Sequence, residues 1–500
     1  MERKSGGFNS RVGLIMTLIG GSVGTGNIWR FPRMAALNGG GAFVIALIIS
    51  SFIVALPILN GEMILGRATR HSGAGAFRDF IGKKYTWMGA YLVAICMLIT
   101  AYYMAILGWV LKYLGMSVTG SYIGKDLEQV FAETTTGDPV TYILFVIPLI
   151  LLAFLLIRGI GTIEKANTFM IPALGLICLV LAIRAVTLPG SLEGVKYYFD
   201  IKPEYFLKPQ TWLNALTQCS WSIGPGFCLT LAYAVFTEKK SDISLNVSMQ
   251  VFGNQSFAIL AGFMILPAVF AMSPTVEDAY AACASGNQGL TFVTLTGMFQ
   301  QMPAGRLVAV LFFIGLTFAA FSSAIGMCNV GMVFLMDLGW SRKKAALASV
   351  AFLWIVGTPS ALSLKVFNNQ DWVWGVALLL SSIFVGFAMF KYGLEKARKN
   401  FLLFPENEWK MGKWWNVCAG FLSPILTAFM IVWWIFQTIQ WFPDNWWDPR
   451  NLDGLGTILL QTFLLIAVLL ATNNKLAGAI KHRYFDGTHF PDLPEEGQEV

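Results

Sequence analysis

Charged residues are scarce in this chain. Asp, Glu, Lys and Arg together make up 13% of its 500 residues, and no polar stretch is long enough to form a separate water-soluble domain. The net charge is +7, but no segment forms an exposed basic domain. These shortages exclude an ordinary soluble globular protein, and they argue against any nucleic-acid partner.

Cysteine and histidine, two residues that often bind transition metals, offer no candidate metal site. The seven cysteines have no pair spacing typical of metal ligands. Most of them (Cys96, Cys178, Cys219, Cys228, Cys328 and Cys418) lie inside apolar runs, whereas His71, His482 and His489 lie outside. We therefore expect buried cysteines without a structural disulfide. Paired catalytic acids and a nucleophile motif are also missing, so an enzyme is not expected.

Apolar residues dominate instead. Hydrophobic residues make up 56% of the chain and aromatic residues 14%. Twelve apolar runs are long enough to cross about 30 Å of hydrocarbon as helices. They cover residues 11–36, 41–67, 86–115, 139–158, 166–187, 210–236, 243–273, 305–337, 343–361, 371–393, 413–438 and 454–473. The sequence predicts an all-α polytopic membrane protein with 12 transmembrane helices.

The positions of the basic residues predict the orientation in the membrane. Short cytoplasmic loops retain Lys and Arg, and the connection after the second run carries Arg67, Arg70, Arg78, Lys83 and Lys84. We therefore expect both termini in the cytoplasm. The short outer connections are typical of bacterial proteins, so the expected location is the plasma membrane, as a bacterial inner-membrane protein.

Two of the runs are interrupted by residues that break helices. The first contains "GGSVGTGNIW" (Gly20 to Trp29), and the sixth contains "SWSIGPGFC" (Ser220 to Cys228). Glycines permit dihedrals that end a helix, and Pro225 removes a backbone donor. Packing kinks are one explanation. Matched breaks in two halves of a chain instead indicate a transporter's binding site, because unpaired backbone groups in lipid survive only beside a cavity or a ligand.

The spacing of the two breaks predicts an inverted repeat of five plus five helices, with two extra helices at the C-terminal end. The predicted divisions are a cytoplasmic N-terminal segment (1–10), the first repeat (11–187), the second repeat (188–395), helices 11 and 12 (396–475) and a cytoplasmic tail (476–500).

Several motifs resemble the neurotransmitter:sodium symporter family. They are "GNIWRFP" (Gly26 to Pro32), "NGGGAF" (Asn38 to Phe43), Glu62, the pair Tyr102 and Tyr103, and "FSSAIG" (Phe321 to Gly326). The resemblance covers nearly the whole chain, with the motifs in the family's order and spacing. It implies the same broken-helix fold and a sodium-coupled secondary active transporter that works by alternating access.

The resemblance implies two sodium sites built from backbone carbonyls and neutral side-chain oxygens, the ligands that a hard cation prefers. The ligands of the first site would be Gly20, Val23, Ala319, Ser322 and Ser323. Those of the second would be Ser22, Asn27, Ser222 and Asn254. For the two asparagines, an interhelical hydrogen bond is the simpler alternative.

The resemblance also places an amino-acid substrate between the two breaks. Its carboxylate would meet the N–H groups of Thr25 and Gly26 and the Tyr103 hydroxyl. Amine-selective members carry an aspartate at the position of Gly24, so this pocket favours a substrate with its own carboxylate. The substrate side chain would lie among Ile99, Trp221, Gly224, Phe227, Gly326 and Met327. This apolar lining predicts a neutral, hydrophobic or aromatic L-amino acid, although plain helix packing also explains Ile99 and Met327.

Charged residues near the ends of the spans match the family's gates. On the outer side, Arg30 would pair with Asp371, with Gln218 nearby. On the inner side, Arg3 or Lys4 would pair with Asp337, and Phe8 would act as an apolar plug. Glu62 would accept hydrogen bonds from the sixth-run break, a structural role; a proton relay is the rival reading. The two positions where members bind chloride, or place a carboxylate, hold Leu47 and Ala258, so a chloride requirement is not predicted.

Alternative functions remain open on the sequence. Within the symporter class, the chain could carry an amine or an osmolyte. From another class, a channel or a non-transporting receptor could use the same fold.

Overall fold

A computed structural model describes residues 7–238, 241–405 and 407–480, and this part of the chain is helical, without a named strand. Ten helical segments are long and apolar enough to cross a membrane. They are α3 to α4 (Gly41–Thr69), η3 to α6 (Lys83–Thr119), α8 (Pro139–Arg158), α9 (Ile160–Val186), α13 (Ile243–Met272), α17 (Gly305–Asp337), α18 (Arg342–Leu362), α19 (Leu364–Tyr392), α21 to α22 (Trp414–Trp441) and α23 (Leu455–Ala479). The expected all-α polytopic architecture is confirmed.

The first predicted span is a bent pair of helices. α1 (Arg11–Ser22) ends at the glycine-rich stretch, and η1 (Gly26–Arg30) continues into α2 (Phe31–Leu37) at an angle of 60° to α1. The amide of Gly24 donates to the side-chain oxygen of Asn27 at 3.0 Å. A local side-chain acceptor therefore competes with the helical backbone pairing at this point, as asparagine side chains do.

The sixth predicted span is divided more completely. α11 (Pro209–Ser222) and α12 (Leu229–Ala234) are separated by a six-residue break. Gly224 and Gly226 flank Pro225 with φ angles of +83° and +92°, which disfavour any residue with a Cβ atom. Neither piece is long enough to count as a span. Among the described residues, up to eleven candidate spans are therefore counted with the bent pair, and α11 with α12 occupies the remaining predicted run, 210–236.

A buried carboxylate holds this second break. Oε1 of Glu62, in α4, accepts a hydrogen bond from the amide of Gly226 at 2.7 Å, and Oε2 accepts one from the amide of Leu231 at 3.3 Å. Glu62 is fully buried. It satisfies backbone donors that the interrupted helix leaves unpaired, which are costly inside a membrane.

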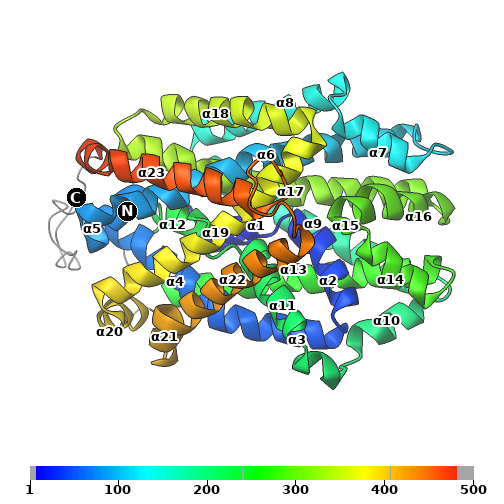
Figure 1. The fold of residues 1–500 in the computed structure, drawn as a ribbon, viewed down its shortest axis with the longest axis horizontal. Helices are drawn as coiled ribbons and strands as arrows, with labels where there is room; N and C mark the ends of the chain where they lie inside the picture. Colours follow the sequence, from blue (N-terminus) through cyan, green and yellow to red (C-terminus); the bar gives the residue numbers. More distant parts are fainter. Residues whose placement is uncertain (1–6, 239–240, 406, 481–500) are drawn as a thin grey trace.

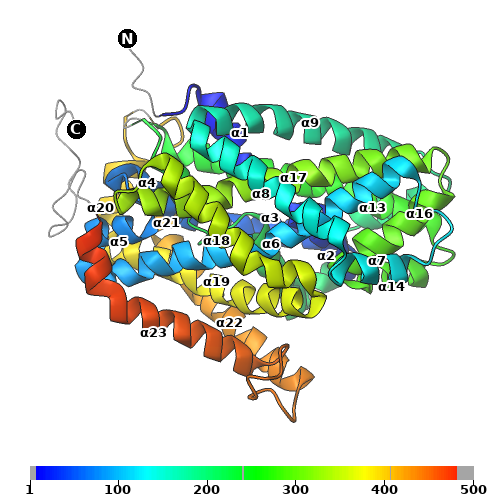
Figure 2. The same ribbon diagram turned by 90° about the horizontal axis from the view of Figure 1, so that it is seen from above.

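α6 lies at the centre of the helical bundle, in contact with α8, α17, α18 and α19 (Figure 1). In the most apolar stretch of this span, 83% of the residues are buried, whereas in the corresponding stretch of α23 only 22% are buried. Figure 2 shows α23 diverging from the other helices at the edge of the molecule. The repeat boundaries and the separate status of the last two helices stay predictions, but the peripheral position of α23 agrees with them.

Short helices that the apolar runs did not indicate lie between the spans. They are α5 (Gly73–Ile81), α7 (Leu127–Thr135), α10 (Ser191–Phe199), η4 (Pro203–Leu207), α14 (Val276–Ala284), α15 (Gly286–Gln288), η5 (Gly289–Thr294), α16 (Leu295–Gln301), α20 (Leu394–Ala397) and η6 (Arg398–Leu402). Figure 1 shows α7, α14 and α16 gathered at one end of the molecule, and α5 and α20 at the other. The predicted orientation, with both termini in the cytoplasm, would make the first end the outer one.

The start of α1 is tied to α9 through one carboxylate. Oε2 of Glu164 accepts hydrogen bonds from the backbone amide and the side chain of Asn9, at 2.7 and 2.9 Å. Oε1 accepts two more from the amide and hydroxyl of Ser10, at 3.1 and 3.0 Å. Gly13 makes room for this carboxylate, because a Cβ atom there would lie 1.9 Å from it.

Candidate functional site

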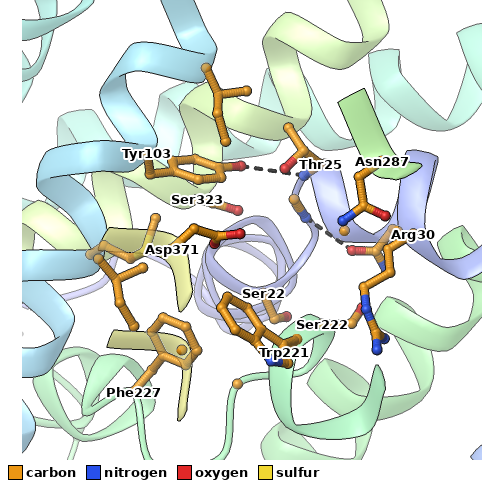
Figure 3. A pocket seen from close by; sticks show the side chains of 18 of the residues that line it. Ser22, Thr25, Arg30, Tyr103, Trp221, Ser222, Phe227, Asn287, Ser323 and Asp371 are labelled. Carbon is orange, nitrogen blue, oxygen red and sulfur yellow. Dashed lines mark hydrogen bonds between the residues drawn. The ribbon is translucent and has the colours of Figure 1, made fainter. Parts of the chain in front are cut away.

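A cavity of about 250 Å³ lies at the two helix breaks. Its walls come from the α1 to η1 break, the α11 to α12 break, α6, α17 and α19. Figure 3 shows Tyr103 on one side of the cavity, with Trp221 and Phe227 on the other. The residues that both breaks expose therefore meet in one space, although they are far apart in the sequence.

Backbone amide groups face this cavity beside a tyrosine. The amide of Thr25 donates to the hydroxyl of Tyr103 at 3.3 Å (Figure 3). A Cβ atom on Gly26 would meet nothing within 4 Å, so the space beside this residue is open. Amides at the start of a helix attract anions, because they lack intrahelical partners and lie at the positive end of the helix dipole. The arrangement suits a carboxylate.

The remaining wall is largely apolar. Among the residues that sequence reasoning assigned to the substrate, Ile99, Trp221, Gly224, Phe227 and Met327 all line the cavity, as do Gly24, Thr25, Gly26 and Tyr103. Gly326 does not. A Cβ atom at Gly326 would lie 2.9 Å from Leu229 and 3.1 Å from the Tyr233 hydroxyl, so this glycine serves close helix packing instead.

The four groups expected at the second ion site gather in the structure. The side-chain amide of Asn254 donates to the carbonyls of Ser22 and Ser222, at 2.9 and 3.0 Å. The hydroxyl of Ser222 and the side-chain amide of Asn27 both lie 3.1 Å from the Asn254 side-chain oxygen. All four residues are buried. Hydrogen bonds thus join α1, η1, α11 and α13 at this point, and the two asparagines make the interhelical hydrogen bond that was the simpler alternative. Their assignment to an ion site stays a prediction.

One contact of the expected first ion site is present across two helices. The Ser323 hydroxyl donates to the carbonyl of Val23 at 2.9 Å, which joins α17 to the end of α1. The Ser322 hydroxyl donates to the carbonyl of Ala319 at 3.0 Å. Gly20 lies one turn before Val23, against the side-chain oxygen of Asn167. Hydroxyl and carbonyl oxygens from two helices therefore lie side by side.

The outer charged residues are not paired as expected. Arg30 and Asp371 both line the cavity, but they do not form an ion pair within 4 Å in the described chain. Arg30 instead donates to the side-chain oxygen of Gln218, whose amide donates to the carbonyl of Gly26 at 3.3 Å. Asp371 accepts a hydrogen bond from Tyr102. Arg30 and Asp371 therefore belong to the lining of one cavity without a direct ion pair between them.

At the inner end, Asp337 has partners that were not expected. It accepts a hydrogen bond from the amide of Ser72 at 2.6 Å, and its other oxygen lies 3.1 Å from the ring of His71. Phe8 packs edge-on against Tyr233, with ring centres 6.2 Å apart. Arg3 and Lys4, the expected partners of Asp337, lie outside the described residues.

Sequence reasoning missed part of the site. Trp372, Gly375, Val376 and Leu379 of α19 line the cavity, and so do Asn287 and Gln288 of α15. The spacing of the α19 residues, at i, i+3, i+4 and i+7, marks one helix face starting beside Asp371. This helical spacing could have been recognised in the sequence. The α15 residues sit on a polar connection without a periodic pattern, so only the fold could place them.

Comparison with known proteins decides the family. The model of the sodium:neurotransmitter symporter family matches residues 5–136 and 134–476. The chain belongs to this family. It is therefore a multi-pass membrane transporter of a sodium-dependent kind, and the resemblance that the motifs suggested is confirmed.

Individual relatives match over different shares of their length. An uncharacterized sodium-dependent transporter of Methanocaldococcus jannaschii is 32% identical over 449 residues, which cover 86% of this chain and 90% of that protein. The mouse sodium-dependent neutral amino acid transporter B(0)AT2 is 25% identical over 292 residues, 52% of this chain and 40% of that protein. The crystal structure of the transporter MhsT in complex with L-phenylalanine superimposes with a TM-score of 0.74 at 27% identity, covering 85% of this chain and 99% of that one.

Proposed function

We propose that this transporter is a sodium-coupled symporter of neutral, hydrophobic or aromatic L-amino acids that works by alternating access. One observation carries the proposal. The amides of Thr25 and Gly26 and the apolar residues Ile99, Phe227 and Met327 line the same cavity. An amino acid with an apolar side chain presents a carboxylate and a hydrophobic group in just this combination.

An amine substrate fits the cavity less well. Asp371 is the only acidic residue among the lining residues that the structure describes, and it lies at the outer end in contact with Tyr102. With glycine at position 24, the first break carries no carboxylate. A Cβ atom there would lie 3.0 Å from the Ser323 hydroxyl, in a polar but uncharged setting. A positively charged ligand without a carboxylate would find no anionic partner at the first break and would place its charge at the positive end of the helix dipole.

The oxygen clusters supply the coupling. A sodium ion among Asn27, Asn254, Ser22 and Ser222 would lie next to the break that receives the substrate carboxylate, so each would favour the binding of the other. With about 100 mV across the membrane and a tenfold gradient, each sodium supplies about 3.7 kcal/mol, or roughly 500-fold accumulation. Two oxygen clusters support two sodium ions. Chloride is not part of the proposal.

Relatives support the substrate class. The name of the mouse relative specifies neutral amino acids, and MhsT was crystallised with L-phenylalanine. We extend this class of substrate, neutral amino acids that include phenylalanine, to this chain because its cavity combines exposed backbone amides with an apolar wall.

Uptake into proteoliposomes tests the proposal. An inward sodium gradient should drive radiolabelled phenylalanine to an internal concentration above the external one, and its dissipation should release the excess. Phenethylamine, which lacks the carboxylate, should compete poorly. Equal competition would support an amine carrier, and uptake that only equilibrates would indicate a channel.

A further inference from the structure

The indole ring of Trp221 occupies the space that a side chain at position 375 would need. A Cβ atom built on Gly375 would lie 2.0 Å from Cζ2 and 2.3 Å from Cη2 of Trp221. Carbon atoms that are not bonded prefer separations of about 3.5–4.0 Å. The ring therefore lies directly against the backbone of α19, and only glycine permits this position.

Gly375 forms a recess in a helix face that otherwise carries side chains. The residues of α19 that line the cavity are Phe367, Asp371, Trp372, Gly375, Val376 and Leu379. They share one face, because residues three and four positions apart lie above one another on a helix. Trp221 reaches this recess from the end of α11, beside the second break. The two residues thus form a contact between the break and α19.

The position of the ring decides how much of the cavity is free. Trp221 and Gly375 both line the cavity, with Ile99, Phe227 and Met327 in the same lining. A side chain at 375 would have to push the indole away from α19 by at least about 1 Å to reach an ordinary contact distance. The ring would then move toward the other walls and shorten the space for a substrate side chain.

We propose that Gly375 is a specificity-determining residue. Its missing side chain lets Trp221 lie against α19, and this keeps the cavity large enough for an aromatic or a large aliphatic substrate. The inference rests on the proposed function, and it adds a residue that fixes the size of the accepted side chain. Gly375 acts through Trp221 and is a positioning residue.

Sodium-dependent binding to the purified full chain tests this role, with tryptophan, phenylalanine, valine and alanine as ligands. Gly375→Ala should weaken the binding of tryptophan and phenylalanine by about tenfold, the scale on which an overfilled apolar pocket discriminates, and leave alanine binding nearly unchanged. The double variant Gly375→Ala/Trp221→Phe should regain affinity for phenylalanine, because the smaller ring leaves room for the new methyl group.

A matched control separates this effect from helix packing. A Cβ atom on Gly175 of α9 would lie 3.6 Å from Phe257, an ordinary contact, so Gly175→Ala should keep the wild-type order of affinities. Equal loss for all four ligands in Gly375→Ala, or no recovery in the double variant, would overturn the inference. If the wild type binds none of these amino acids in a sodium-dependent way, the proposed function fails instead.

Discussion

The ring of His71 bridges two buried aspartates. Its Nδ1 atom lies 3.1 Å from Oδ1 of Asp337, and its Nε2 atom lies 3.3 Å from Oδ2 of Asp79. None of the three side chains is exposed. The guanidinium of Arg78 also contacts Asp79, at 2.7 Å from its Oδ1 atom.

Replacing this histidine should destabilise the protein. His71→Leu removes the ring contacts to the buried carboxylates of Asp79 and Asp337, and losing a polar contact at a buried site costs about 1–3 kcal/mol. We expect a clear drop in the thermal unfolding midpoint in detergent. The double variant His71→Leu/Asp79→Asn removes one of the two carboxylates and should recover part of the loss. An unchanged midpoint in His71→Leu would show that the bridge contributes no stability.

The oxygen cluster around Asn254 should determine sodium affinity. Asn254→Ala removes the side-chain oxygen that lies 3.1 Å from both Ser222 and Asn27. Losing one polar contact to an ion corresponds to a roughly tenfold or larger loss of affinity. The measurement is phenylalanine binding as a function of sodium concentration, and Asn27→Ala should behave in the same way.

Asn445 supplies the control for this prediction. It lies in the connection between α22 and α23, and Asn445→Ala should leave the sodium dependence at its wild-type value. The assignment of the ion site would be wrong if Asn254→Ala and Asn445→Ala required the same sodium concentration for half-maximal binding.

Glu62 should act as a fixed acceptor. In Glu62→Gln, one position that now accepts from Gly226 or Leu231 becomes an amide donor, so two donors face each other at a buried site. An unsatisfied buried donor costs about 1–3 kcal/mol. We expect a lower unfolding midpoint and loss of phenylalanine binding, while Glu193→Gln, at an exposed position of α10, has no effect. A stable Glu62→Gln variant with altered pH dependence of transport would favour the proton-relay reading.

The position of Val376 in the cavity lining predicts a pattern of chemical labelling. All seven native cysteines are buried, so the background reaction with an impermeant thiol reagent should be low. A cysteine introduced by Val376→Cys lines the cavity and should react. Sodium plus phenylalanine should slow this reaction about tenfold by closing the site to solvent.

Ile123 provides the matched position for labelling. It is 56% exposed, in the turn after α6, and Ile123→Cys should react equally with and without substrate. If Val376→Cys reacts no more slowly with substrate than without it, closure of the site to solvent on binding would be ruled out.

Hydrophobic patterning was sufficient to predict the spans. The runs 139–158 and 305–337 match α8 and α17 at both ends, because lipid imposes a long apolar stretch on any crossing helix. The breaks were also visible, since glycine and proline mark them directly. The motifs located Asn27 and Asn254, whose side chains the structure brings into contact.

Other contacts depend on tertiary packing that no local pattern specifies. His71 and Arg78 were assigned to a basic cytoplasmic connection, whereas both are fully buried in the structure. Gly375 is one of 49 glycines, and its importance appears only when the Trp221 ring is seen against it. The pairing of Arg30 with Gln218 rather than Asp371 reflects the relative position of three helices, which sequence spacing does not determine.

The clasp that Glu164 makes around Asn9 and Ser10 limits how the inward-facing state can arise. If the base of α1 swings outward alone, four hydrogen bonds to a single carboxylate must break together. If α9 moves together with α1, the four hydrogen bonds remain intact, and the two helices move as one rigid unit. We therefore expect opening at this end of the molecule either to break all four hydrogen bonds together or to move α1 and α9 jointly.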